Sequence, residues 1–260
     1  MNLLFSQNLS QLSANYLITP SSYGGFLLRY YGVAAAGVTV ALTDCGQVRL
    51  NINGDDKINV DVDFLNQADN LYGGYIEFAS AIGGAFNVAV YIPTGAWFDP
   101  QNVYNLTKDM NSQFILDFPN MTAAVIASGN INISGILQPG TMTYYHKMLS
   151  YSVVSAGVSI ITNTIAKDNI IELYLKDPSS LISNIQLNKN SITYVNGNIL
   201  DELYLSNFQH NLESAVTLYA CEFANSHNLS QATGNNLVFN YTFIGAGTLA
   251  QYYSQIEYLK

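Results

Sequence analysis

The chain has 260 residues, enough for one large domain or two of ordinary size. Only 10% of the residues are charged and the net charge is −9, so no basic surface is available for phosphates and we expect no direct nucleic-acid partner. Hydrophobic residues make up 49%, which can fill two cores and argues against disorder. No stretch of the sequence is apolar over the roughly 18 residues that a membrane span needs.

Residues 1–20 predict a separate N-terminal arm that Pro20 ends. Its apolar residues recur at nearly helical intervals: Leu3, Leu4, Phe5, Leu9, Leu12 and Tyr16. We expect a short amphipathic helix that packs on its own barrel or faces a membrane or a neighbouring subunit. No Lys or Arg precedes Arg29, so membrane contact would be weak and apolar. The segment lacks the features of a secretory signal, and we expect synthesis in the cytoplasm.

A β pattern begins at Phe26 and continues through the first half of the chain. Apolar and polar side chains alternate over residues 58–64, 86–92 and 114–118, as in strands with one wet face. Residues 93–100 form the longest loop candidate of this half and hold Trp97 and Phe98. We interpret these two aromatic residues as anchors of the loop, with an exposed contact site as the alternative.

One module of the sequence occurs twice, over residues 27–54 and again over residues 172–197. Each copy predicts a strand, a short crossing, two strands and an Asn-Gly turn. At one offset, Leu28 matches Leu173, Val40 matches Ile185 and Leu42 matches Leu187; a gap of two residues then brings Asn53-Gly54 onto Asn196-Gly197. The repeat therefore predicts a duplicated domain with equivalent Asn-Gly turns.

The best domain boundary is Gln138-Pro139-Gly140, because Pro and Gly together interrupt both helix and strand. Each half offers about eight short strands punctuated by Gly, Asn and Pro, which is typical of a jelly roll. The predicted fold is all-β: two tandem eight-stranded jelly rolls with short helices, comprising an arm over 1–20, a first jelly roll over 21–138 and a second over 139–260.

No catalytic, cofactor-binding or metal-binding constellation stands out in the sequence. The histidines have no zinc-like spacing to one another or to Cys45 and Cys221, and we expect free thiols, with a disulfide between the halves as the alternative. These histidines are His146, His210 and His227. We expect no enzymatic activity.

Clustered carboxylates leave a calcium site open as an alternative to a solvated strand face. They are Asp55, Asp56, Asp61 and Asp63. Asn-x-Ser/Thr sequons are expected by chance in so polar a chain, and we do not expect glycosylation. They begin at Asn8, Asn105, Asn120, Asn132, Asn228 and Asn240.

The paired module and the two closing strand patterns of each half resemble the double jelly-roll major capsid proteins of tailless icosahedral viruses with an internal membrane. The module comprises residues 28–54 and its second copy ending at residue 197, and the closing patterns are residues 114–118 with 131–136 and 237–243 with 252–259. The first half departs from the second by being longer, which suggests an insertion around Gly83 to Gln101, with halves that are not truly equivalent as the alternative.

The resemblance implies a structural role in the virion. Three subunits would form a pseudo-hexameric capsomer, and capsomers would tile an icosahedral shell, as of a bacteriophage, around an internal membrane that the N-terminal arm could touch. A surface low in charge suits large permanent contacts between subunits. The alternative function is a receptor- or carbohydrate-binding jelly-roll module, such as a spike or lectin.

Overall fold

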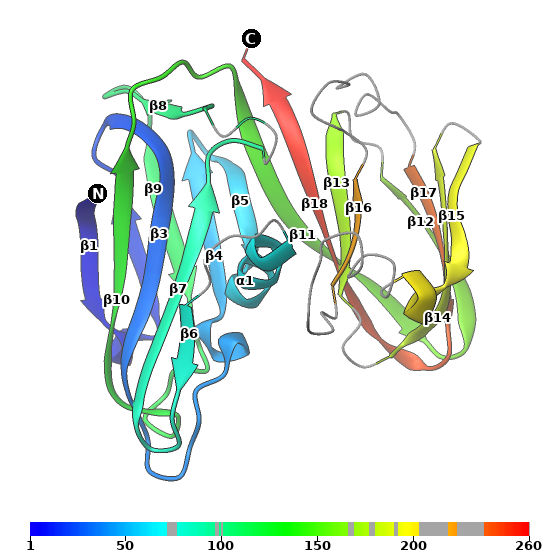
Figure 1. Cartoon of the computed structure of the whole chain (residues 1–260), viewed down its shortest axis with the longest axis horizontal. Coiled ribbons are helices and arrows are strands. Elements are labelled where there is room, and N and C mark those ends of the chain that lie inside the picture. Colours follow the sequence, from blue (N-terminus) through cyan, green and yellow to red (C-terminus); the bar gives the residue numbers. More distant parts are fainter. Residues whose placement is uncertain are drawn as a thin grey trace. The chain divides into compact units, whose positions relative to one another are not determined.

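A computed structural model describes residues 1–71, 77–96, 99, 101–165, 169–176, 180–189, 192–202, 218–222 and 237–259 (Figure 1). The chain forms two compact units. The first unit comprises Met1–Leu149 together with Glu257–Lys260, and the second comprises Ser150–Ile256.

The first unit has two sheets. One has the order β1-β10-β3-β7-β6, with β8 pairing with the start of β3, and the other includes the order β5-β4-β9-β2. The bounds are β1 Asn2–Asn8, β2 Ser13–Leu17, β3 Ser21–Ala34, β4 Gln47–Ile52, β5 Asp55–Asp61, β6 Glu77–Ser80, β7 Ala85–Pro93, β8 Tyr104–Leu106, β9 Ser112–Asp117 and β10 Ile126–Leu137. The helices are η1 Leu9–Gln11, η2 Leu42–Cys45 and α1 Val62–Leu71.

The second unit also has two sheets, with the orders β12-β17-β14-β15 and β16-β13-β18-β11. The bounds are β11 Tyr144–Ala156, β12 Ser159–Ile165, β13 Ile170–Lys176, β14 Ile182–Lys189, β15 Ile192–Asn198, β16 Leu218–Glu222, β17 Leu237–Phe243 and β18 Ala246–Tyr258. The first residues of β11 and the last residues of β18 belong to the first unit.

The two units share one strand order. The order β1-β10-β3-β7 recurs as β11-β18-β13-β16, and β2-β9-β4-β5 recurs as β12-β17-β14-β15. Each set of eight strands in two sheets is a jelly roll, so the predicted double jelly roll is confirmed. In the first unit, β6 and β8 are added to the eight core strands.

The core of the first unit follows from the two-residue period of its strands. In β4 and β9 every second residue is buried, which places one face of each strand between the sheets. Aromatic rings fill the space: Phe26 and Phe114 from opposite sheets meet edge to face at 4.9 Å between centroids, and Tyr30 meets Phe118 at 6.1 Å. Such contacts join the two sheets more tightly than area burial alone.

The predicted helical arm is wrong, because the N-terminal residues form β1, η1 and β2. β1 pairs with β10 and β2 pairs with β9, so both are core strands of the first jelly roll. Leu9 and Ala14 are buried, and the ring of Phe5 lies 5.1 Å from that of Tyr16. Pairing with distant strands has overridden a local helical pattern. The N-terminal residues are therefore part of the first jelly roll, and their predicted contact with a membrane stays a prediction.

The strand predicted over residues 58–64 is also partly wrong. β5 ends at Asp61, and Val62 begins α1. Val62, Leu65 and Ala68 are buried at helical spacing, so tertiary packing selects the helix although the sequence still alternates there.

The predicted equivalence of the two copies of the repeat is correct for one strand and wrong for the next. Leu28 and Leu173 do lie in equivalent strands, β3 and β13. Residues 38–41 form no strand, and the strand equivalent to β14 is β4. Asn53-Gly54 forms the β4–β5 turn with positive φ at both residues, whereas Asn196-Gly197 lies inside β15. The two Asn-Gly pairs are therefore not equivalent.

The predicted boundary at residues 138–140 falls in the connection between β10 and β11. The compact units divide later, at Leu149. Met148 and Leu149 of β11 pair in parallel with Ile58 and Asn59 of β5, and this pairing keeps the start of β11 with the first unit.

Deleting residues 2–15 should unfold or strongly destabilise the first jelly roll, because β1 and most of β2 would be lost with the buried side chains of Leu9 and Ala14. The measurement is thermal unfolding combined with limited proteolysis mapped to residues 1–149. The control is Asn15→Ser, which changes an exposed residue of β2 and should leave unfolding unchanged. A truncated protein with an intact first unit would show that the two strands are dispensable.

Candidate assembly surfaces

The histidines and cysteines of the sequence form no cluster in the described part of the chain. His146 is buried in β11, and burial lowers its pKa to about 4. Cys45 is a buried free thiol, as predicted, and burial raises its pKa. His210 and His227 lie outside the described residues, as does the side chain of Cys221.

The four aspartates do not converge on one point. Asp55 forms ion pairs, Asp56 accepts a hydrogen bond from Asn51, and Asp63 lies in the first turn of α1 and accepts a hydrogen bond from Gln67. Within the described residues, no group of three or more His, Cys, Asp or Glu side chains could hold a metal ion.

The loop after β7 is anchored by polar contacts on both sides of the predicted aromatic pair. The buried amide of Asn102 donates hydrogen bonds to the carbonyl oxygens of Thr94 and Tyr144, at 2.7 and 3.2 Å. Trp97 and Phe98 themselves lie outside the described residues, so their predicted anchoring role stays a prediction.

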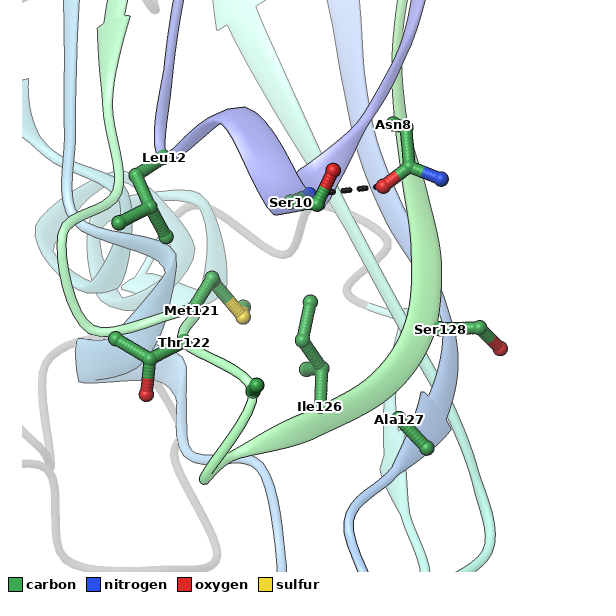
Figure 2. A pocket seen from close by; sticks show the side chains of 9 residues that line it. Asn8, Ser10, Leu12, Met121, Thr122, Ile126, Ala127 and Ser128 are labelled. Atoms are coloured by element: carbon green, nitrogen blue, oxygen red, sulfur yellow. Dashed lines mark hydrogen bonds between the residues drawn. The ribbon is translucent and has the colours of Figure 1, made fainter.

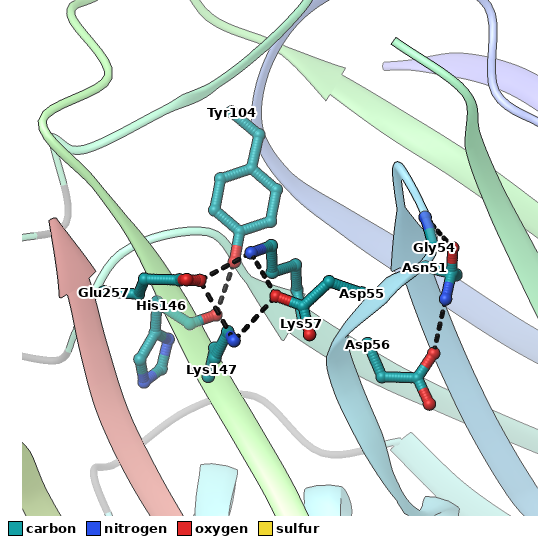
Figure 3. A network of polar contacts seen from close by, with 9 residues as sticks. All are labelled: Asn51, Gly54, Asp55, Asp56, Lys57, Tyr104, His146, Lys147 and Glu257. Carbon is teal, nitrogen blue, oxygen red and sulfur yellow. Dashed lines mark hydrogen bonds and ion pairs between the residues drawn. The ribbon is translucent and has the colours of Figure 1, made fainter. Parts of the chain in front are cut away.

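A cluster of four charged side chains joins three strands of the first unit (Figure 3). Lys57 Nζ lies 2.8 Å from Asp55 Oδ2 and 2.5 Å from Glu257 Oε2, and Lys147 Nζ lies 2.8 and 3.0 Å from the same two oxygens. Lys57 is only 4% exposed, and its ammonium lies 3.9 Å above the centroid of the Tyr145 ring. Sequence reasoning missed this cluster because 200 residues separate Lys57 from Glu257.

The cluster balances two positive and two negative charges. Partial burial alone would raise the pKa of Asp55 and of Glu257, but hydrogen bonds from Lys57 and Lys147 outweigh it and lower both pKa values. Each carboxylate therefore contributes stability above its ordinary pKa range, which is lost as the pH falls through the lowered value. The cluster ties the last residues of the chain to β5 and β11 and so completes the first unit.

A shallow pocket of about 380 Å³ opens in the first unit between the end of β1 and residues 121–128 (Figure 2). Leu12, Met121 and Ile126 give it an apolar floor, and Asn8 and Ser10 lie at its rim, joined by a hydrogen bond of 2.8 Å. None of its lining residues is charged, and most are small or aliphatic. Its hydroxyl groups come from Ser10, Thr122 and Ser128, and no lining residue is a His, Lys, Asp or Glu that could serve them as a base.

The strand edges are the remaining surface features of note. In the described residues, β1 pairs only with β10 and β15 only with β14, so each has one outer edge without a partner strand. Leu3 on β1 is 62% exposed, and neither strand carries a charged residue. Uncharged edges with exposed apolar side chains readily pair with another strand.

No helix in the described part of the chain is long and apolar enough to cross a membrane.

Comparison with known proteins gives the class of the fold. No protein-family model matches the sequence, and no curated protein matches it. The structure is similar to the major capsid protein P2 from bacteriophage PM2, with a TM-score of 0.67 and 12% sequence identity over 100% of this chain and 96% of that chain. It is also similar to the PBCV-1 virus capsid, with a TM-score of 0.65 and 8% identity over 97% and 93% of the two chains.

A third similar structure is PBCV-1 VP54 fitted into a reconstruction of the virophage Sputnik, with a TM-score of 0.60 and 9% identity over 94% of this chain and 89% of that one. At these identities the similarity establishes the fold. It extends over nearly the full length of each chain, so both jelly rolls are shared. The resemblance drawn from the sequence is thus confirmed: the chain has the double jelly-roll fold of major capsid proteins.

Replacing Glu257 with Gln should lower the free energy of unfolding by about 1–2 kcal/mol, because Lys57 and Lys147 then share one carboxylate. The partial exposure of the carboxylates keeps the effect below that of a fully buried pair. Urea unfolding measures the change. The control is Asp117→Asn, since that exposed carboxylate lies 3.9 Å from Arg49 and should contribute about 0.5 kcal/mol or less. Equal effects of the two variants would contradict a stabilising cluster.

The buried imidazole of His146 should make stability depend on pH below neutrality. An unfolded histidine binds a proton near pH 6.5, whereas folded His146 remains neutral until about pH 4. Above about pH 6.5 both states are neutral at His146, and its full contribution to the free energy of unfolding is present. As the pH falls towards 4, the unfolded state binds a proton that the folded state does not, and the free energy of unfolding falls by about 3 kcal/mol at most. The variant His146→Gln should flatten this part of the profile in urea unfolding at a series of pH values. An unchanged slope would mean that the pKa of His146 is the same in the folded and the unfolded state.

Proposed function

We propose that this chain is a major capsid protein that assembles into the shell of a virion. The observation that carries the proposal is the presence of two jelly rolls with one strand order in a single chain, similar over its whole length to the capsid protein of bacteriophage PM2. Two similar units in one chain suit a closed ring of subunits, in which each copy fills two similar places.

Composition supports the same conclusion. With 10% charged residues, most of the surface can be covered by other protein at a low desolvation cost. The net charge of −9 disfavours direct contact with a genome, so the shell would enclose its contents without binding nucleic acid.

The unit of assembly in this proposal is a homotrimer. Three copies bring six jelly rolls together, and similar units can occupy six similar places around a ring. Such pseudo-hexameric capsomers would tile an icosahedral shell around an internal membrane. The protein would be made in the cytoplasm of the host and function in the virion.

Purified protein at micromolar concentration should be a trimer by light scattering, and negative-stain microscopy should show compact rings or shells. The physical reason is that low-charge surfaces of two similar units favour permanent contacts. The control is Leu50→Asp, which places a charge in the core of the first unit. It tests whether assembly requires the folded protein. A monomer that persists across the concentration range would contradict the capsid role and favour a receptor- or sugar-binding module.

A further inference from the structure

The outer edge of β5 in the first unit has a partner strand. Met148 and Leu149, at the start of β11, pair in parallel with Ile58 and Asn59 of β5. β11 then continues as the first core strand of the second jelly roll. The start of β11 is thus added to the strand set β2-β9-β4-β5, next to β5.

The shared strand order identifies the equivalents of these two strands. β15 occupies in the second unit the position that β5 occupies in the first, at the end of its four-strand set. β1 is the first strand of the first jelly roll, as β11 is of the second. In the described residues, β15 and β1 each have an outer edge without a partner strand. β15 therefore has a free edge like the one that β5 offers to β11. β1 is the strand equivalent to β11 and also has a free edge.

We propose that β1 of one copy pairs in parallel with the outer edge of β15 of a neighbouring copy. The proposal rests on the capsid function and names the contact that closes the capsomer. It is a heterologous contact, since one copy supplies β15 and the next supplies β1, and three such contacts close a ring. The binding mode is strand addition to a free sheet edge.

The amino-acid composition of β1 and β15 favours their pairing. Neither β1, with the sequence NLLFSQN, nor β15, with the sequence ITYVNGN, carries a charge that would oppose pairing. The exposed side chain of Leu3 would be covered in the contact. β2 and β12 also lie at sheet ends, but the paired example within the chain uses β5 and β11, whose equivalents are β15 and β1.

The contact between copies differs from the contact within the chain in its charge. Asp55 and Lys57 on β5 and Lys147 on β11 form ion pairs beside the pairing of those strands. β1 and β15 have no such residues, so backbone hydrogen bonds and apolar contact would hold them. The association of copies should accordingly change little between low and high salt.

The first test places a lysine on the edge of β1. Leu3→Lys should shift the trimer towards monomer and raise the concentration of half-dissociation at least about tenfold, because an edge lysine opposes strand pairing. The matched control is Ile82→Lys, which changes a 75% exposed residue of the same unit outside β1. Analytical ultracentrifugation measures dissociation, and thermal unfolding shows that both variants are folded. Equal dissociation of Leu3→Lys and the wild-type protein would overturn the proposal.

The second test uses cysteine pairs and does not depend on the fold tolerating a lysine. A variant with Leu3→Cys and Thr193→Cys, and another with Leu3→Cys and Asn196→Cys, should form disulfides between copies under mild oxidation, giving covalent dimers and trimers. Each single variant is the control and should form no trimer band. Absence of cross-linked trimers from both pairs would overturn the contact.

The results of these experiments distinguish an error in the strand contact from an error in the proposed function. If the wild-type protein is a trimer, but Leu3→Lys is also a trimer and neither pair cross-links, the strand contact is wrong and the capsid role stands. If the wild-type protein is a monomer at every concentration, the capsid role itself fails and the strand contact fails with it.

Discussion

Each jelly roll depends on the pairing of its earliest strand with its latest. β1 pairs with β10 along nearly its whole length, and in the second unit β18 lies between β13 and β11. These pairings join segments about as far apart as each unit allows, so all the intervening strands must be placed before the sheets close. The aromatic core of the first unit and the position of the free edges follow from that closure.

The ion-pair cluster extends the same principle to the whole chain. Glu257 returns to Asp55 and Lys57 after 200 residues, so the first unit is complete only when the end of the chain is present. In a chain with few charges, four are used at this one place, where Lys57 is buried and each charge has two opposite partners.

Duplication gives the chain two units that share a strand order but differ in their surroundings. The edge of β5 is paired with β11, while the equivalent edge of β15 lacks a partner strand in the described residues. In the proposed assembly, this free edge of β15 receives β1 of a neighbouring molecule. The low charge of the free edges leaves strand pairing unopposed.

The sequence by itself determined the class of the fold, because the two-residue alternation in segments such as β4 and β9 is set by which face of a strand is buried. It also determined the tight turn at Asn53-Gly54, where a local conformation with positive φ selects the residues. Only the tertiary structure decided that residues 2–17 form strands, that α1 begins at Val62 and that Lys57 meets Glu257. Those outcomes depend on partners far along the chain, whose contact free energies exceed local propensity and leave no mark in the local pattern.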